Sequence, residues 1–222
     1  MGKLIVFEGI DGSGKSTQFR LFTNWLEKTG AKFRRLTFPR YSEPSSALLK
    51  MYLNGDFGSK PEDVNAYASS TFYAVDRIAS YLSDWGEYYR GGGMLITDRY
   101  TTSNAIHQGA KLPLQRREDY YKWLFDFEYN LLGLPRPDIV IYFDMPAGKS
   151  IELLKKRQQE TGEKADIHET EKKFLELSRT SALEAARFDG WYVVNCAPDN
   201  ILRSEEDIHD EVLKIIKKEV AL

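Results

Sequence analysis

Cysteine is almost absent from this chain of 222 residues, and neither sign of charge dominates it. The one cysteine, Cys196, has no partner in the chain for a disulfide, which favours a reducing compartment. Lysine and arginine together number 31 against 33 acidic residues, so the formal net charge is -2. Proteins that bind duplex nucleic acid usually carry a strong basic excess, so this balance argues against nucleic acid as a partner. A local basic pocket for phosphates is still allowed.

Long hydrophobic runs are also missing. The first apolar run, Leu4–Phe7, ends at Glu8 and is too short for the core of a signal peptide. No stretch approaches the roughly 20 apolar residues that cross a bilayer. Because 42% of the residues are hydrophobic, the chain can still build a sizeable core. We therefore expect a cytoplasmic protein that makes no membrane contact.

Short apolar segments alternate with segments of helical character. The expected strands are Leu4–Glu8, Phe33–Phe38, Met94–Asp98, Asp138–Asp144 and Trp191–Asn195. The expected helices are 15–28, 61–89, 118–132, 147–159, 171–188 and 204–219. Near-continuous apolar strands such as 139–143 are typical of a sheet covered by helices on both faces. The alternation predicts an α/β fold with a five-stranded parallel sheet in a single domain, 1–222.

The strongest motif follows the first expected strand directly. Residues 9–16, Gly-Ile-Asp-Gly-Ser-Gly-Lys-Ser, match the phosphate-loop pattern G-x-x-x-x-G-K-[ST] at every position. Glycines let consecutive backbone N–H groups turn toward phosphate oxygens, and the next helix adds its positive N-terminal end. Lys15 then reaches the β- and γ-phosphates, and Ser16 offers its hydroxyl to Mg²⁺. The pattern predicts the P-loop NTPase fold and a triphosphate site formed by Gly9, Ile10, Asp11, Gly12, Ser13, Gly14, Lys15, Ser16 and Thr17.

Two classes of protein that share this loop fit the rest of the sequence poorly. A GTPase needs a guanine-reading N-K-x-D segment, which is absent here. Motor and AAA-type ATPases normally carry two adjacent acidic residues after a later apolar strand, whereas this chain has Asp98 followed by Arg99. At the carboxyl end of a strand, Asp98 can hold Mg²⁺ through water and Arg99 can pair with a phosphate. A purely structural salt bridge is the alternative for this pair.

Three motifs in combination resemble the bacterial thymidylate kinases, which are P-loop nucleoside monophosphate kinases. They are the phosphate loop with Asp11 inside it, the Phe-Pro-Arg segment 38–40, and the run 98–109 that begins Asp-Arg-Tyr. The resemblance implies a transferase that moves the γ-phosphoryl group of ATP to dTMP with Mg²⁺, giving dTDP and ADP for nucleotide biosynthesis. It also implies a homodimer, with helix 61–89 as the interface. A P-loop kinase for another monophosphate or a deoxynucleoside stays open, as does a non-catalytic nucleotide switch.

The resemblance also implies roles for single residues. Asp11 lies between donor and acceptor, and Arg99 clamps the acceptor phosphate with help from Arg40. Two arginines suit a monophosphate because each planar guanidinium can bond two oxygens. From the long helix, Tyr73 stacks on thymine and Arg77, one turn later, bonds the base edge. The remaining substrate contacts are Phe38, Ser103, Asn104, His107 and Gln108, while Ser16 and Asp98 serve the metal.

An alternative for Tyr73 is that it packs into the core. The apolar positions of the same helix, 64, 68, 72, 75, 79 and 82, form a stripe at helical spacing. We expect this stripe, with Phe72, to face the core.

Three departures from the family pattern affect these roles. Many members have Phe-Pro-x-Arg, whereas Arg40 follows Pro39 directly. His107 replaces a tyrosine or phenylalanine thought to crowd a ribose 2′-hydroxyl, so sugar discrimination is expected to change. The phosphate loop lacks the arginine that some members place there, so the transition-state charge should be met from a lid, 155–170. Its candidates are Arg157 and Lys164, and segment 166–169 resembles the acidic part of the family lid; a solvated charged helix end is the alternative.

Overall fold

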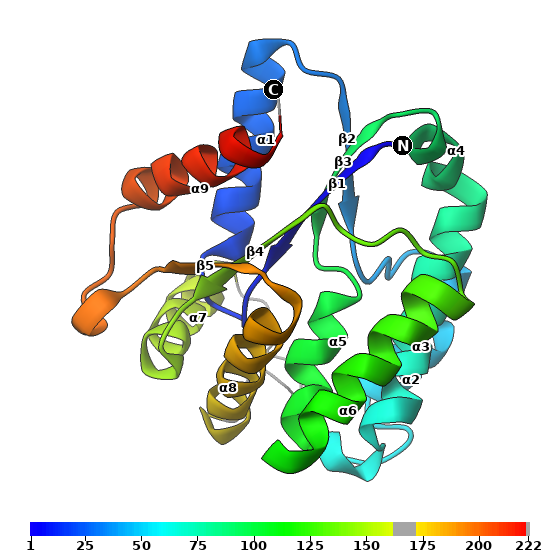
Figure 1. Ribbon diagram of the computed structural model, residues 1–222. Helices are drawn as coiled ribbons and strands as arrows, with labels where there is room; N and C mark the ends of the chain where they lie inside the picture. The colour runs from blue at the N-terminus through cyan, green and yellow to red at the C-terminus, as the bar shows by residue number, and fades with distance from the viewer. Residues whose placement is uncertain (162–171, 221–222) are drawn as a thin grey trace.

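The computed structural model describes residues 1–161 and 172–220, apart from the side chains of residues 157, 160 and 161. Its strands are β1 (Lys3–Glu8), β2 (Phe33–Thr37), β3 (Met94–Asp98), β4 (Ile139–Asp144) and β5 (Tyr192–Asn195). They pair in parallel in the order β2-β3-β1-β4-β5 (Figure 1). The predicted five-stranded parallel sheet is confirmed, and each strand lies within two residues of its expected bounds.

The helices around the sheet include two that the sequence pattern did not predict, α2 and α5. The described helices are α1 (Lys15–Thr29), α2 (Ala47–Leu53), α3 (Ala66–Ser80), α4 (Gly86–Arg90), α5 (Thr102–His107), α6 (Leu114–Phe125), α7 (Ala147–Thr161), α8 (Lys172–Asp189) and α9 (Glu205–Glu219). The missed helices are only seven and six residues long, too short to show a helical period. Among the described residues, no helix is both long and apolar enough to cross a membrane.

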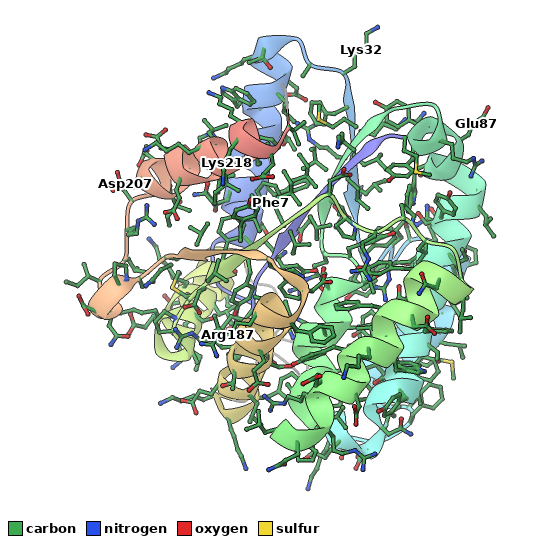
Figure 2. The ribbon with its side chains drawn as sticks, viewed as in Figure 1. Phe7, Lys32, Glu87, Arg187, Asp207 and Lys218 are labelled. Atoms are coloured by element: carbon green, nitrogen blue, oxygen red, sulfur yellow. The ribbon has the colours of Figure 1, made fainter. Side chains whose placement is uncertain are left out.

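Helices cover both faces of the sheet, as predicted. On one face, Phe7 of β1 packs with Phe22 of α1 and Val212 of α9, and α9 lies beside α1 in Figure 1. On the other face, Val6 belongs to a cluster with Trp85 and with residues of α5, α6 and α8. Figure 2 shows Phe7 in the interior, whereas Lys32 and Glu87 project outward. Alternate residues of a buried strand thus serve two cores.

The expected helix 61–89 was wrong as one continuous element. Pro61–Asp63 forms a separate 3₁₀ turn, and Val64 has extended backbone angles (φ -109°, ψ 118°). Helix α3 then begins after Asn65, whose side chain accepts a hydrogen bond from the Ala68 N–H at 2.9 Å. An Asn N-cap satisfies one of the four free N–H groups of a helix start. Farther on, the π-helical turn Tyr81–Trp85 separates α3 from α4.

The apolar stripe of α3 was wrong as the core-facing side. Val75 is 45% exposed and Leu82, in the π-helical turn, is 75% exposed, while Phe72 is only partly buried, against the rings of Tyr52 and Phe57. The buried side of α3 carries mainly polar and small residues instead: Ala66, Ser69, Ser70, Ala74, Asp76, Arg77 and Ser80. Their hydrogen-bonding partners come from distant segments, which hydrophobic periodicity does not register.

Candidate active site

The phosphate loop lies between β1 and α1, at the edge of the sheet where the strands end, and two cavities meet there. The first cavity, about 330 Å³, extends from the loop toward β3, α3 and α5. The second, about 420 Å³, extends toward α7 and the segment before α9. Asp11, Lys15 and Ser16 line both. Ligands of open parallel sheets bind at this edge, where the strand order reverses, so two ligands can meet at one side chain.

Close packing and backbone conformation explain two glycines of the loop. Gly12 has a φ of +75°, and a Cβ there would come within 2.4 Å of the Ser150 carbonyl oxygen. Gly14 has a φ of +82° at the start of α1. L-residues rarely adopt these angles. These conformations lead the loop into the α1 N-terminus, where helix N–H groups can bind an anion.

Lys15 and Asp98 form an ion pair at the centre of the site, joined through Nζ and Oδ1. Burial and the nearby Arg99 lower the pKa of Lys15, while Asp98 opposes that shift. Both side chains are at least 85% buried, at 7% and 15% exposure. Ser16, on the adjoining turn, also lines the first cavity. A hydroxyl and a carboxylate are hard oxygen ligands, so this donor set fits Mg²⁺ shared with phosphate oxygens.

Arg99 is held in an unusual conformation that directs its side chain into the first cavity. Its φ is +68°, and its N–H donates to the Phe7 carbonyl oxygen at 3.1 Å. The guanidinium donates to Asp11 Oδ1 at 2.5 Å and lies 2.8 Å from His107 Nε2. Burial alone would lower the pKa of Arg99, but Asp11 and the neighbouring carboxylates raise it overall. A non-glycine residue in the left-handed region is a strained feature typical of functional sites.

Glu8, which holds Tyr100 and Ser103 of the first cavity, was missed by the sequence reasoning. Its carboxylate is fully buried and accepts hydrogen bonds from the Tyr100 N–H at 3.1 Å, Thr102 Oγ1 at 2.7 Å and Ser103 Oγ at 2.8 Å. Burial raises the pKa of Glu8, although Arg99 and these hydrogen bonds oppose the shift. Glu8 thus ties the end of β1 to the start of α5. The available signal was an acidic residue that ends an otherwise apolar strand.

Most of the predicted substrate-binding residues line the first cavity. They are Asp11, Phe38, Tyr73, Arg77, Arg99, Ser103, Asn104, His107 and Gln108, together with Lys15, Ser16 and Asp98. Tyr73 is partly buried on α3 and reaches this cavity, which the core-packing alternative did not anticipate. Leu53 of α2 and Tyr41 also line it and were not predicted. Leu53 was not predicted because α2 itself was missed, and Tyr41 lies in the turn after β2, outside any expected element.

Arg77 lines the first cavity and also forms a buried ion pair with Glu128. Its Nε and Nη2 donate to Glu128 at 2.6 and 2.5 Å, and both side chains are almost completely buried. Glu128 also accepts from Thr101 Oγ1 at 2.8 Å and Asn104 Nδ2 at 3.2 Å. A two-pronged pair of this kind fixes the plane of the guanidinium. Glu128 is therefore a buried anchor for the wall of the cavity.

Replacement of Glu128 by Gln should destabilise the protein by about 3 kcal/mol, because the buried Arg77 charge would lose its counter-charge. The free energy of unfolding from urea titration measures this. Glu118→Gln is a matched control, since the Glu118–Lys122 pair is exposed on both sides and its loss should leave unfolding unchanged. Equal stability of the Glu128 variant and the wild type would contradict a structural role for the pair.

Arg40 does not line the first cavity. Its N–H donates to Asp76 Oδ2 at 2.8 Å, and its guanidinium lies 3.8 Å from both Asp76 and Asp84. Asp76 is buried beside Arg77 on α3. Arg40, which follows Pro39 directly where many family members have one residue between, is thus directed at α3. Its role in substrate binding stays a prediction.

The second cavity supplies contacts that the sequence left unassigned. Beyond the phosphate loop it is lined by Met145, Leu153, Leu154, Lys156, Cys196, Leu202, Arg203, Glu205 and Ile208. Arg203 is held by Glu211 at 2.5 Å and by the Asn195 carbonyl oxygen at 3.1 Å. Burial raises the pKa of Cys196 to about 12, so this thiol is unreactive. The apolar lining beside the loop suits a flat base.

The predicted lid is only partly described. Residues 155–161 form the last part of α7, and the side chain of Arg157 lies outside the described residues. Lys164 and segment 166–169 lie outside them as well.

Comparison with known proteins agrees with this geometry. The sequence model of the thymidylate kinase family matches residues 7–210. The thymidylate kinase of Mycobacterium tuberculosis is 31% identical over 190 residues, covering 85% of this chain and 87% of that protein. A probable thymidylate kinase of Pyrococcus horikoshii is 31% identical over 223 residues, covering 99% and 98%. The solved thymidylate kinase of Candida albicans shares the fold, with a TM-score of 0.70 at 20% identity, covering 98% and 92%. This chain belongs to the thymidylate kinase family.

Proposed function

We propose that this protein performs the family reaction at the two meeting cavities: the γ-phosphoryl group of ATP passes to dTMP, giving ADP and dTDP. Family membership supports this reaction. The observation that carries the assignment of the site is the shared lining of both cavities by Asp11, Lys15 and Ser16. A donor nucleotide in the second cavity and an acceptor in the first would meet at the lysine.

In this proposal, positive side chains hold the two phosphates together. The loop N–H groups and Lys15 bind the triphosphate, while Arg99 binds the acceptor phosphate and is aimed by Asp11 and His107. Bound Mg²⁺, held by Ser16 and through water by Asp98, would neutralise charge on the phosphate oxygens. The acceptor oxygen is already anionic at neutral pH, so positioning and charge neutralisation suffice without a strong general base.

The base site is proposed for the far end of the first cavity. Tyr73 offers a ring for stacking, and Arg77, Asn104 and Gln108 offer polar groups from α3 and α5. Stacking combined with a few fixed polar groups is the usual means of reading a base. His107 lies beside Arg99 at the phosphate end, and Ser103 lines the same cavity.

Arg157 is proposed to supply transition-state charge from the lid, because the phosphate loop contains no arginine. Arg157→Ala should lower kcat about a hundredfold and change the KM for dTMP less than threefold, since the contact would form only in the transition state. Steady-state kinetics with varied dTMP measures both. An equal loss in kcat and in affinity would count against this role.

A homodimer and a cytoplasmic location complete the proposal. Val75 of α3 and Leu82 of the following π-helical turn are exposed and give an apolar surface that a second copy could cover. Sedimentation should then give a mass twice that of the chain, which is 25.6 kDa. The Leu82→Asp variant should sediment with the mass of a single chain. The lone buried cysteine suits a reducing compartment.

An acceptor panel tests the reaction. Purified protein with Mg²⁺ and ATP is offered dTMP, dUMP, UMP, dCMP or thymidine, and ADP release is followed by a coupled assay. We expect the highest kcat/KM for dTMP. A preference for another acceptor would favour a different nucleotide kinase, and ADP release without any acceptor dependence would favour an ATPase.

A further inference from the structure

Lys111 is a partly buried cation outside the residues assigned to the reaction. It ends the 3₁₀ turn Gly109–Lys111 after α5. Its Nζ donates to Tyr52 Oη at 2.8 Å, the Val64 carbonyl oxygen at 2.9 Å and Ser69 Oγ at 3.1 Å. All three acceptors are neutral, and among the described residues no carboxylate lies within ion-pair distance of this ammonium. Partial burial of a charge whose partners are all neutral oxygens costs free energy, so this contact is not a simple surface ion pair.

The contact with Ser69 continues to the first cavity. Ser69 Oγ lies 2.7 Å from Gln108 Oε1, and both residues are buried. Gln108 lines the cavity. Because an ammonium only donates, it occupies a lone pair of Ser69 and turns the hydroxyl proton away from itself. Gln108 Oε1 is nearer to that hydroxyl than the carbonyl oxygens of Asn65 and Ala66, at 2.9 and 3.4 Å.

The neighbouring amide of Asn104 has a different kind of anchor. Its Nδ2 donates to the Ser70 carbonyl oxygen and to Glu128 Oε1, each at 3.2 Å. Both partners are acceptors only, so a flipped Asn104 would set its own oxygen against two oxygens. Asn104 therefore offers Oδ1 to a ligand independently of Lys111 and Gln108. The Ser69 hydroxyl beside Gln108, in contrast, can either donate or accept a hydrogen bond. Its orientation therefore depends on its other hydrogen-bonding partner, Lys111.

We propose that Lys111 is a positioning residue that, through Ser69, fixes the Gln108 amide with its NH₂ group toward the base and so selects keto- over amino-pyrimidine monophosphates. The ammonium favours the oxygen end of the amide dipole on its own side. Asn104 Oδ1 and Gln108 Nε2 then form an acceptor and a donor side by side. Thymine presents the matching N3–H and O4, whereas cytosine presents N3 and an amino group, a mismatch at both positions.

The protonation state of Lys111 makes this selection sensitive to pH. Burial lowers the pKa of Lys111 to about 7, and the carboxylate of Glu62 opposes this shift. Tyr52 on α2 and Glu62 are the titratable groups facing it among the described residues, and α3 contributes the neutral Ser69. Below that pKa the Lys111 side chain is protonated and the Gln108 amide is held in one orientation. Above it the neutral amine can accept the Ser69 proton, which frees Gln108 to turn.

The test rests on the proposed function and compares kcat/KM for dTMP with that for dCMP. In Lys111→Met, which keeps the bulk, we expect the dTMP-to-dCMP ratio to fall about tenfold at pH 6.5. Ser69→Ala should reduce the ratio similarly. The double variant should have the same ratio as either single variant, because both residues act through one chain of hydrogen bonds to Gln108. Lys122→Met, an exposed lysine on α6, is the control and should keep the wild-type ratio.

The pH profile separates positioning from simple destabilisation. In the wild type the ratio should fall between pH 6 and 8.5 as Lys111 loses its proton, while the Lys111→Met ratio should stay flat. Titration of the substrate phosphates cancels, because both acceptors carry the same group. A Lys111→Met ratio within twofold of the wild type, or effects of the two single variants that multiply, would overturn the inference. If the wild type did not phosphorylate dTMP, the proposed function would fail with it.

Discussion

Lys15→Ala should lower kcat by about a thousandfold or more and leave the fold intact. The Lys15 ammonium lies where the two cavities meet and pairs with Asp98. Its loss removes the charge that would follow the γ-phosphoryl group during transfer, and preorganised charges of this kind are worth several orders of magnitude. Coupled measurement of ADP release with dTMP and ATP gives the effect on the rate.

The matched control is Lys28→Ala, an exposed lysine in the last turn of the same helix, α1. It should keep wild-type kcat, which shows that loss of a lysine from α1 is not itself harmful. Circular dichroism should show the wild-type fold for both variants, while Lys15→Ala should unfold at a somewhat lower temperature because Asp98, 15% exposed, loses its ion-pair partner. An active Lys15→Ala enzyme would contradict the assignment of the phosphate loop.

Arg99→Ala should lower kcat/KM for dTMP by about a thousandfold, and Arg99→Lys by about a hundredfold. The lysine keeps the charge, but a point charge cannot replace the planar fork that contacts Asp11 and His107 and would bond two phosphate oxygens. Because Arg99 lines the acceptor cavity and not the other one, the KM for ATP should change less than threefold. Kinetics with each substrate varied in turn separates the two.

Arg116→Ala, an exposed arginine on α6, should behave as the wild type in the same assays. Equal rises in the KM for ATP and for dTMP would show that Arg99 acts through the overall positive charge of the site and does not bind the acceptor specifically. Retention of at least half the wild-type kcat/KM by Arg99→Lys would show that charge alone is sufficient at this position.

The sequence alone determined the parts that depend on local pattern. Strand-like segments alternating with helices specify a parallel sheet, and its central strands β1, β3 and β4 are apolar because both of their faces are covered. The phosphate loop is a contiguous motif whose glycines, such as Gly12, are required by its own backbone angles. The run from Asp98 likewise follows directly from the end of β3, so Arg99 could be placed from its neighbours.

Only the tertiary structure decided which polar groups are buried and what they contact. The stripe on α3 pointed to the wrong side, because the buried side is satisfied by Glu128 and Tyr120, about 50 residues away. Glu8 and Glu128, which hold residues of the first cavity, and Lys111, which is linked to it through Ser69, were not predicted for the same reason. A hydrogen bond between distant segments stabilises a buried polar group without leaving any periodic trace in the sequence. Hydrophobic pattern thus determines the layers, and long-range pairing determines the walls of the site.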